Sequence, residues 1–340
     1  QAWDAVLKDI EKVGVDSVLC LGDVIGYGPS PAQVMELAYE KCDHFVLGNH
    51  DAVVGDRLDS ELFNDNAKYI IDWTRNQLSS DVAQFFADMP LRMEGPGFAC
   101  AHGELAAPGR FGYIYNADDS IASFNTTDHP LMFVGHTHQP AVFTCNQKQG
   151  TVQQVESHDF VVQTDLRYLV NAGSVGDPRD GTTNATYVIY DAQTNQVIFR
   201  HVPFSVDDYR KDLEMAMLPT RNYFLSVDAG TYQETDTLKD MRVSEKSMTK
   251  ELPRKAAKIT GMHTTRQSIK FAKSGIATQH LRSSKRRVKK EDLTALKPAA
   301  RSSKSQVPEK KSKTAIIIGA SIVSLLGIIG LTLTFSGEEK

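Results

Sequence analysis

The sequence is poor in cysteine: it has four in 340 residues, and no two of them are spaced C-x-x-C. It therefore lacks the paired spacing that is typical of structural zinc sites and disulfide frameworks. The residues around the cysteines are apolar or ordinary, which favours buried free thiols and a reducing compartment. The cysteines are Cys20, Cys42, Cys100 and Cys145.

Aromatic residues are almost absent from residues 241–313, where Phe271 is the only one. This segment has 21 Lys and Arg against 5 Asp and Glu, whereas the whole chain has a formal charge of −4. Because few large apolar residues are available to bury, we predict a disordered basic linker. Its charge suits anionic lipid or, less well, nucleic acid, since stacking on single-stranded bases needs aromatic rings. A solvated tether without a partner is an open alternative.

Charged residues are missing altogether from residues 315–335, which are mostly aliphatic. A helix of about 20 such residues spans a bilayer core, so we predict a transmembrane helix over 314–336. The sequence before it is rich in lysine, and the positive-inside rule then places the N-terminal domain in the cytoplasm. The expected protein is a single-pass membrane protein that contacts membrane lipid through this span.

Helix-like and strand-like patterns alternate over the first 205 residues. Apolar residues recur at helical spacing over 2–13, and further helical patterns cover 31–41 and 65–78. Five apolar runs with strand character lie among them: SVLCLGD, HFVLGNHD, GFACAHGE, PLMFVGHTH and RYLVNAGSVGDP. This alternation predicts an α/β domain over residues 1–205. We expect residues 206–240 to pack as a short helical extension.

The first four of these runs end in residue types that bind metals. They are Asp23, Asn49, His102, and the pair His136 and His138. In open α/β sheets the loops at the carboxyl ends of strands form the ligand site, so these side chains are expected to meet. Carboxylate, amide and imidazole donors without cysteine suit Mn, Fe, Zn, Ni or Co ions.

The motifs GDVIGYG, GNHD and GHTH, in this order, resemble those of the calcineurin-like metallophosphoesterases, and NAGSVGDPRDG resembles a further signature of a bacterial subgroup. The resemblance covers roughly residues 1–205. It implies a two-sheet α/β sandwich flanked by helices and a site for two divalent metal ions. It also implies hydrolysis of phosphomonoester or phosphodiester bonds by a metal-activated water. The fold does not select the class of phosphorylated substrate.

The resemblance gives each candidate ligand a role. Asp23 is similar to the carboxylate that bridges both metals. Asn49, His102 and His136 resemble the other ligands of the second metal, and His138 resembles a ligand of the first. A bridging carboxylate holds two cations about 3.5–4 Å apart, the spacing at which they stabilise both the attacking and the leaving oxygen.

Three further residues are candidates for contact with the substrate. His50 resembles the histidine that sits over the scissile phosphate and stabilises the transition state or protonates the leaving oxygen. Asp51 would orient His50, as carboxylates commonly do for a working imidazole. Arg179 would contact a substrate phosphate through its planar guanidinium, or else form a salt bridge within its loop.

One element of the family pattern is missing. The family begins with an Asp-x-His motif on a first strand inside the sheet, which supplies two ligands of the first metal, and no such motif precedes Gln1. Because the other ligand types are all retained, we expect an N-terminally truncated enzyme. The alternative is a non-catalytic binding or scaffold protein with an incomplete metal site. Gly22 and Gly26 would let the backbone approach a metal-bound carboxylate and its phosphate ligand closely.

Overall fold

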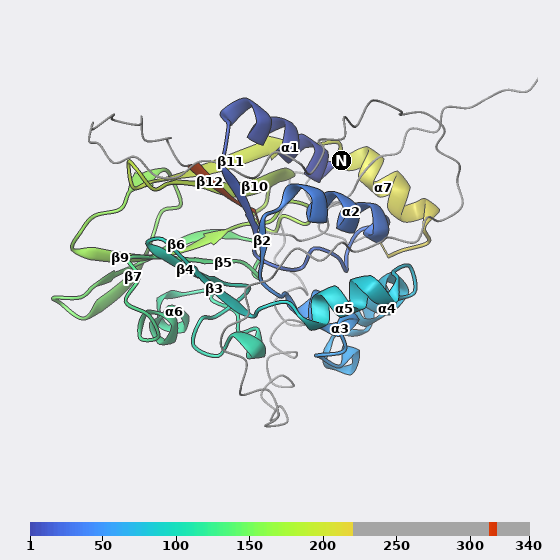
Figure 1. Ribbon diagram of the computed structural model, residues 1–340, viewed down its shortest axis with the longest axis horizontal. Coiled ribbons are helices and arrows are strands. Elements are labelled where there is room, and N and C mark those ends of the chain that lie inside the picture. The colour runs from blue at the N-terminus through green and yellow to red at the C-terminus, as the bar shows by residue number, and fades with distance from the viewer. Residues whose placement is uncertain (220–312, 318–340) are drawn as a thin grey trace, which may run out of the picture.

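The computed structural model describes residues 1–219 and 313–317. Two six-stranded sheets pack face to face, with helices on their outer sides (Figure 1). The helices are α1 (Ala2–Val13), α2 (Pro31–Lys41), α3 (Asn49–Val54), α4 (Asp65–Arg75), α5 (Ser80–Ala87), α6 (Ala117–Phe124) and α7 (Val206–Met215), with short 3₁₀ turns η1 (Ser60–Leu62) and η2 (Pro108–Arg110). The strands are β1 (Ser17–Cys20), β2 (His44–Phe45), β3 (Arg92–Gly95), β4 (Phe98–Ala101), β5 (Leu131–Val134), β6 (Pro140–Asn146), β7 (Thr151–Val155), β8 (Phe160–Val161), β9 (Leu166–Ala172), β10 (Asn184–Asp191), β11 (Gln196–Pro203) and β12 (Lys313–Ile317).

Both sheets mix parallel and antiparallel neighbours. Their strand orders are β2-β1-β12-β10-β11-β8 in the first sheet and β3-β4-β5-β9-β6-β7 in the second. β1 runs parallel to β2 and β12, and β5 runs parallel to β4 and β9. Chain neighbours such as β6 and β7, or β10 and β11, form antiparallel hairpins. The prediction of an α/β fold is confirmed, with mixed sheets.

Strand β5 shows why the apolar runs of the sequence are continuous. Its residues Leu131 and Phe133 join the core between the two sheets, together with Leu19 of β1. Met132 and Val134, which point to the opposite face, join a second core that α6 covers. Both faces of the strand are therefore buried, which removes the polar alternation expected of a half-exposed strand.

Residues 2–13 form helix α1, as their apolar spacing predicted, and this helix covers the outer face of the first sheet. Trp3 on its inner face is fully buried. On the same helix, the carboxylate of Asp9 accepts hydrogen bonds from the Tyr187 hydroxyl at 2.8 Å and from Arg200 at 2.8 and 3.0 Å. The Arg200 bonds hold the pKa of Asp9 below its ordinary value. The helix is thus tied to β10 and β11 by a polar anchor as well as by packing.

The four cysteines are free thiols, as predicted, and three of them are buried. Burial raises the pKa of the Cys100 thiol to about 12, so the group stays protonated at neutral pH. These side chains act as small apolar residues of the core.

The structure corrects the prediction for the end of the chain. Residues 314–317, predicted as the start of a transmembrane helix, belong to strand β12. This strand lies inside the first sheet, parallel to β1 and antiparallel to β10. The rest of the predicted span lies outside the described residues, as does the predicted basic linker except for Lys313. Among the residues that the structure describes, no helix is long and apolar enough to cross a membrane.

The interior place of β12 leads to a testable consequence. Each backbone N–H of an interior strand faces one of its two neighbours, and Ala315 is paired with Val18 on one side and Ile189 on the other. Replacing Ala315 by Pro removes a donor and leaves a buried acceptor unsatisfied. We expect the free energy of unfolding to fall by about 1–3 kcal/mol in urea titrations of the full chain. Ala315→Ser, which keeps the N–H, is the control. Equal free energies of unfolding of the two variants would contradict the place of β12 inside the sheet.

Candidate metal centre

The predicted ligands come from loops that follow parallel strands in both sheets. Asp23 follows β1, His102 follows β4 directly, and His136 follows β5. Because parallel strands end at the same edge of a sheet, these loops meet where the two sheets lie together. One ligand atom from each of the three side chains lies within 4.8 Å of the others, and all three residues are buried. This cluster, Asp23 with His102 and His136, is called the ligand cluster below.

His102 lies at the middle of the ligand cluster. Its Nδ1–H donates to the Leu21 carbonyl at 2.7 Å, so in the neutral ring the lone pair is on Nε2. That nitrogen lies 3.3 Å from Asp23 Oδ2, 3.2 Å from Asn49 Oδ1 and 2.9 Å from His136 Nδ1. Asn49 thus joins the ligand cluster. Asp23 Oδ2, Asn49 Oδ1 and His136 Nδ1 thus all lie within 3.3 Å of His102 Nε2.

Such a set of donors needs positive charge among them. Burial alone would raise the pKa of Asp23, but the imidazoles of His102 and His50 outweigh burial and hold that pKa below its ordinary value. For His102, burial would lower the pKa, and the negative charge of Asp23 outweighs it, so this pKa is raised. A divalent cation would supply the same charge, and one carboxylate, one amide and two imidazoles are the donors that Mn, Fe or Zn ions accept. The residues therefore fit a metal ion.

The backbone is strained at three of the predicted ligands. Asp23, His136 and His138 have φ angles of 53°, 69° and 61°, in the left-handed region that residues with a side chain seldom adopt. Strain of this kind costs of order 1–3 kcal/mol per residue and gathers at ligand-binding sites. Its presence at three residues in two loops of one site indicates that these turns are built to aim the side chains.

Two glycines allow the loops to approach one another. A Cβ on Gly22 (φ 93°) would lie 2.5 Å from the backbone nitrogen of Gly48. A Cβ on Gly26 (φ 110°) would collide with the ring of His50. The sequence predicted that both glycines make room for a metal-bound carboxylate and its phosphate ligand. In the structure the close neighbours are instead the Gly48 backbone at Gly22 and the His50 imidazole at Gly26.

The imidazole of His50 is held between two aromatic rings beside the ligand cluster. Its centroid lies 4.3 Å from that of Tyr27 and 4.9 Å from that of Phe63, the latter nearly stacked. The backbone N–H of His50 donates to Asp23 Oδ1 at 3.0 Å, which links the helix start at α3 to the first ligand. The ring is therefore fixed in place next to the side chains that would hold a metal.

Asp51 connects the two loops that carry the ligands. Its Oδ2 accepts the backbone N–H of Asp23 at 2.7 Å and that of Gly48 at 3.1 Å. Burial and the nearby charge of Asp23 raise the pKa of Asp51 to about 7. The structure thus gives this carboxylate a role in fixing the backbone. That it also orients His50 stays a prediction.

His138 stands beside the ligand cluster rather than in it. Its Nδ1–H donates to the Asp177 carbonyl at 2.7 Å and lies 3.1 Å from the Asp177 carboxylate. This arrangement puts the lone pair on Nε2, as in metal-binding histidines whose other nitrogen is held by a carboxylate. Asp177 also accepts hydrogen bonds from Arg179 at 3.1 and 3.3 Å. The salt bridge within the loop, one of the two alternatives predicted for Arg179, is therefore present. Contact of Arg179 with a substrate phosphate stays a prediction.

Sequence reasoning missed residues that support the site. Asn171 donates through Nδ2 to the Gly135 carbonyl at 2.7 Å and to Thr137 Oγ1 at 2.9 Å, which fixes the loop that carries the two histidines. Asn171 and Asp177 both lie in the NAGSVGDPRDG motif, so a signal was there without an assigned role. Tyr113, whose ring stacks on His136 at 3.8 Å, had no motif around it.

Strand β12 has a position that matters for a second metal. It runs parallel to β1, so its carboxyl end at Ile317 lies beside the end of β1 that leads to Asp23. Its sequence, KTAII, contains no carboxylate, amide or imidazole. Among the described residues, β12 therefore adds no metal ligand, and Asp23 and His138 remain the candidates for the first metal that the family resemblance implies.

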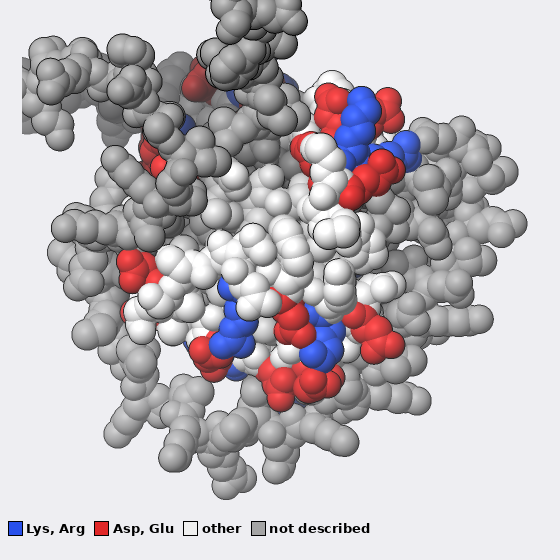
Figure 2. All heavy atoms as spheres, turned by 90° about the vertical axis from the view of Figure 1, so that its right-hand side faces the viewer, with Lys and Arg blue, Asp and Glu red and all other residues white. Residues whose placement is uncertain are grey.

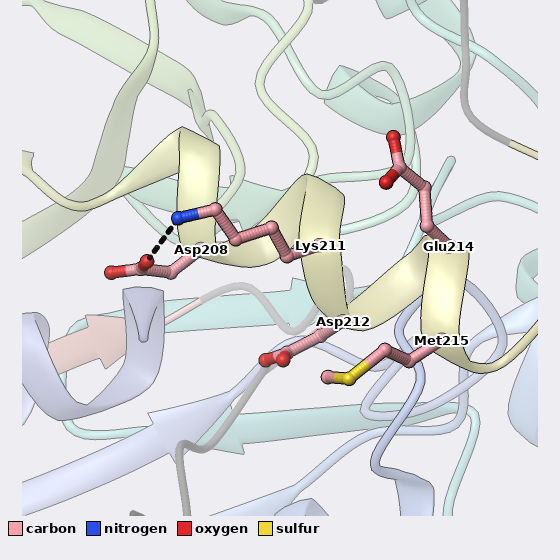
Figure 3. Close-up of a pocket in the computed structure, with 5 residues that line it drawn as sticks. All are labelled: Asp208, Lys211, Asp212, Glu214 and Met215. Atoms are coloured by element: carbon pink, nitrogen blue, oxygen red, sulfur yellow. Dashed lines mark ion pairs between the residues drawn. The ribbon is translucent and has the colours of Figure 1, made fainter.

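Helix α7 carries a hollow on its surface. It is lined by Asp208, Lys211, Asp212, Glu214 and Met215, and Lys211 forms an ion pair with Asp208 at 3.5 Å (Figure 3). None of these residues is a predicted ligand.

On this side of the molecule, charged residues of both signs lie next to one another, with an uncharged band between two groups (Figure 2). The described residues on this face thus form no patch of a single sign.

Two mixed sheets carry a buried carboxylate–amide–imidazole cluster at their strand ends, as the resemblance to the metallophosphoesterases implies. Residues 1–195 match the Calcineurin-like phosphoesterase superfamily domain, and the chain belongs to this family. The resemblance seen in the sequence motifs is confirmed.

The chain is similar to several proteins with known sequences or structures. The chain is 32% identical to the uncharacterised protein MJ0912 of Methanocaldococcus jannaschii over 64% of its own length and 89% of that protein. A metallophosphoesterase from Sphaerobacter thermophilus is 33% identical with a TM-score of 0.57, and the match covers 68% of this chain and 94% of that one. The hypothetical protein PH1004 of Pyrococcus horikoshii shares the fold at 17% identity, with a TM-score of 0.51 over 66% and 92% of the two chains.

Proposed function

We propose that the protein hydrolyses phosphomonoester or phosphodiester bonds with water at a site for two divalent metal ions. The observation that supports this most is the meeting of Asp23, Asn49, His102 and His136 around one point. A divalent cation there supplies Lewis acidity to a phosphoryl oxygen and makes water acidic enough to react near neutral pH. Asp23 is the proposed bridge to a second ion, with His138 as its other described ligand.

Two side chains of the site are suited to act on the phosphate ester itself. His50 lies next to Asp23, and an imidazole can donate a proton to a leaving oxygen at neutral pH. Arg179 is fixed by Asp177, and its Nη2 lies 3.4 Å from the Tyr27 hydroxyl. A guanidinium held in this way can pair with a phosphate oxygen without losing much freedom on binding.

A binding protein without catalysis is the second candidate. It is favoured by the absence of ligand types from β12, which leaves the first-metal position with two candidate ligands among the described residues. A single ion held by Asp23 with Asn49, His102 and His136 would still bind a phosphate group through electrostatic attraction. The retention of His50 between its two aromatic neighbours speaks for the enzyme, since a binding site has no need of a proton donor.

Metal removal and readdition separate the two candidates. We expect the full chain purified with Mn²⁺ to hydrolyse bis(p-nitrophenyl) phosphate or p-nitrophenyl phosphate, because aryl leaving groups demand least of an enzyme. EDTA should abolish the release of p-nitrophenolate. Adding excess Mn²⁺ to the stripped protein should restore the release, whereas adding buffer without divalent metal ions should not. Bound Mn²⁺ without any turnover of either ester would favour the binding protein. Turnover that resists EDTA would contradict metal dependence.

A further inference from the structure

The loop between β5 and β6 carries two predicted ligands on either side of Thr137. Both of them, His136 and His138, have left-handed φ angles, of 69° and 61°. Residues with a side chain seldom adopt this region, so other contacts have to hold the loop there. His136 belongs to the ligand cluster, whereas His138 is the candidate ligand of the first metal. The conformation of this one loop therefore bears on both predicted metal positions.

The side chain of Asn171, near the end of β9, holds this loop and is fully buried. Its Nδ2 donates to the Gly135 carbonyl at 2.7 Å and to the Thr137 hydroxyl at 2.9 Å. Its Oδ1 accepts the backbone N–H of Gly173 at 3.1 Å. The Thr137 hydroxyl in turn accepts the backbone N–H of Gln139 at 3.2 Å. The Asn171 amide and the Thr137 hydroxyl together therefore hold the loop before and after its two histidines.

Further hydrogen bonds connect the loop to the rest of the site. The backbone N–H of Gly135 donates to the His102 carbonyl at 2.7 Å, so the residue that Asn171 holds is also tied to the ligand cluster. At the other end of the loop, His138 Nδ1–H donates to the Asp177 carbonyl at 2.7 Å. Asn171 and Asp177 both belong to the NAGSVGDPRDG motif. This one segment thus contacts the loop at the level of each histidine.

We propose that the buried hydrogen bond between Asn171 and Thr137 positions His136 and His138 together, so that metal binding at both positions depends on this one contact. Asn171 and Thr137 are then positioning residues, which act through the two histidines. This inference rests on the proposed two-metal site. Replacing a residue that orients metal ligands typically lowers metal affinity about 10–100-fold. Loss of the Thr137 hydroxyl would leave one N–H of Asn171 buried without its partner, which favours a shift of the loop.

The test is titration calorimetry with Mn²⁺ on the full chain, first stripped with EDTA. Thr137→Val keeps the branched shape but removes the hydroxyl, and we expect each of two Mn²⁺ ions to bind at least about 10-fold more weakly. Thr137→Ser keeps the hydroxyl and should bind Mn²⁺ as the wild type does. Thr74→Val on α4 is the matched control with unchanged affinity, because the buried Thr74 hydroxyl has no hydrogen-bond partner among the described residues.

A double-mutant cycle assigns the effect to the contact with Asn171. Asn171→Ala removes the donor, so adding Thr137→Val to it should cause little further loss of Mn²⁺ affinity. Losses that add in full would overturn the assigned contact. Urea unfolding of the stripped variants gives a readout of the fold alone. A lower free energy of unfolding in Thr137→Val with Mn²⁺ affinity as in the wild type would show a merely structural hydroxyl and overturn the proposal.

The stoichiometry of the wild type separates this proposal from the function on which it rests. If the wild type binds two ions and Thr137→Val weakens only one of them, shared positioning by this contact is overturned and the two-metal site stands. A wild type that binds fewer than two ions would overturn both. Weakening of both ions in Thr137→Val, in a protein whose wild type hydrolyses neither nitrophenyl ester, would support the positioning role and contradict the proposed hydrolysis.

Discussion

Replacing Asp23 by Asn is expected to weaken Mn²⁺ binding by at least about 10–100-fold, the loss typical of changing a group that merely supports a metal ligand. Asp23 supplies the one negative charge of the ligand cluster, 3.3 Å from His102 Nε2. Asparagine keeps the size and one oxygen but removes the charge that attracts the cation. Because Asp23 is also the proposed bridge, both ions should be affected. Titration calorimetry with Mn²⁺, on protein first stripped with EDTA, measures the change.

The same substitution elsewhere provides the control. Asp9 is hydrogen-bonded to Tyr187 and Arg200 on the outer face of the first sheet. Asp9→Asn should lower stability modestly, since a half-buried ion pair is lost, and leave Mn²⁺ affinity as in the wild type. If Asp23→Asn bound Mn²⁺ as tightly as Asp9→Asn does, the ion would have to lie somewhere other than the ligand cluster.

Replacing His50 by Gln is expected to lower kcat about 10²–10⁴-fold, the usual contribution of a positioned general acid. Glutamine can still donate a hydrogen bond, but it cannot give up a proton to a leaving oxygen. The effect should be largest for alkyl phosphates, whose leaving oxygen needs protonation, and smaller for p-nitrophenyl esters. Steady-state kinetics with both kinds of substrate separates these cases.

Metal content distinguishes a catalytic role of His50 from a structural one. The His50 ring contacts Tyr27 and Phe63, and its backbone N–H bonds to Asp23. His50→Gln should therefore keep the Mn²⁺ content of the wild type. His158, an exposed histidine outside the motifs, gives the matched control His158→Gln with unchanged kcat. Unchanged kcat in His50→Gln as well would show that the assigned role is wrong.

Local patterns predicted the parts of the fold that local physics determines. The helix over 2–13 appears as α1 with the same bounds, because its apolar face packs on the first sheet. The run over 44–51 was expected to be a strand, yet only His44 and Phe45 pair, and Asn49 already begins α3. The early helix start could not be seen in the composition of that run, since it depends on Asp51 reaching back to the Gly48 N–H and across to the Asp23 N–H, the latter contact formed only in the folded chain.

The end of the chain shows where composition misleads. An apolar, uncharged sequence suits a membrane helix and an interior strand alike, and residues 314–317 form a strand between β1 and β10. Length favoured the helix, while the pairing that decides for the strand involves partners about 125 and 300 residues away along the chain. Such long-range pairing leaves no mark on the local pattern.

The candidate site followed from motif order, but its supporting residues did not. Strand-end position alone was enough to suggest that Asp23, Asn49, His102 and His136 meet. The roles of Asn171 and Asp177 depend on which backbone groups lie opposite them after folding. The stack of Tyr113 and Tyr115 on His136 is likewise a three-dimensional arrangement, since tyrosines two residues apart in a loop have no fixed relation to a distant histidine.

The most direct test of this account is a crystal structure of the full chain grown with Mn²⁺, with anomalous data collected to locate the ion. The account predicts an anomalous peak between the side chains of Asp23, Asn49, His102 and His136, and a second, weaker peak between Asp23 and His138 if the bridge operates. An anomalous peak elsewhere in the chain, or none at saturating Mn²⁺, would contradict the claim that these four side chains form a metal site.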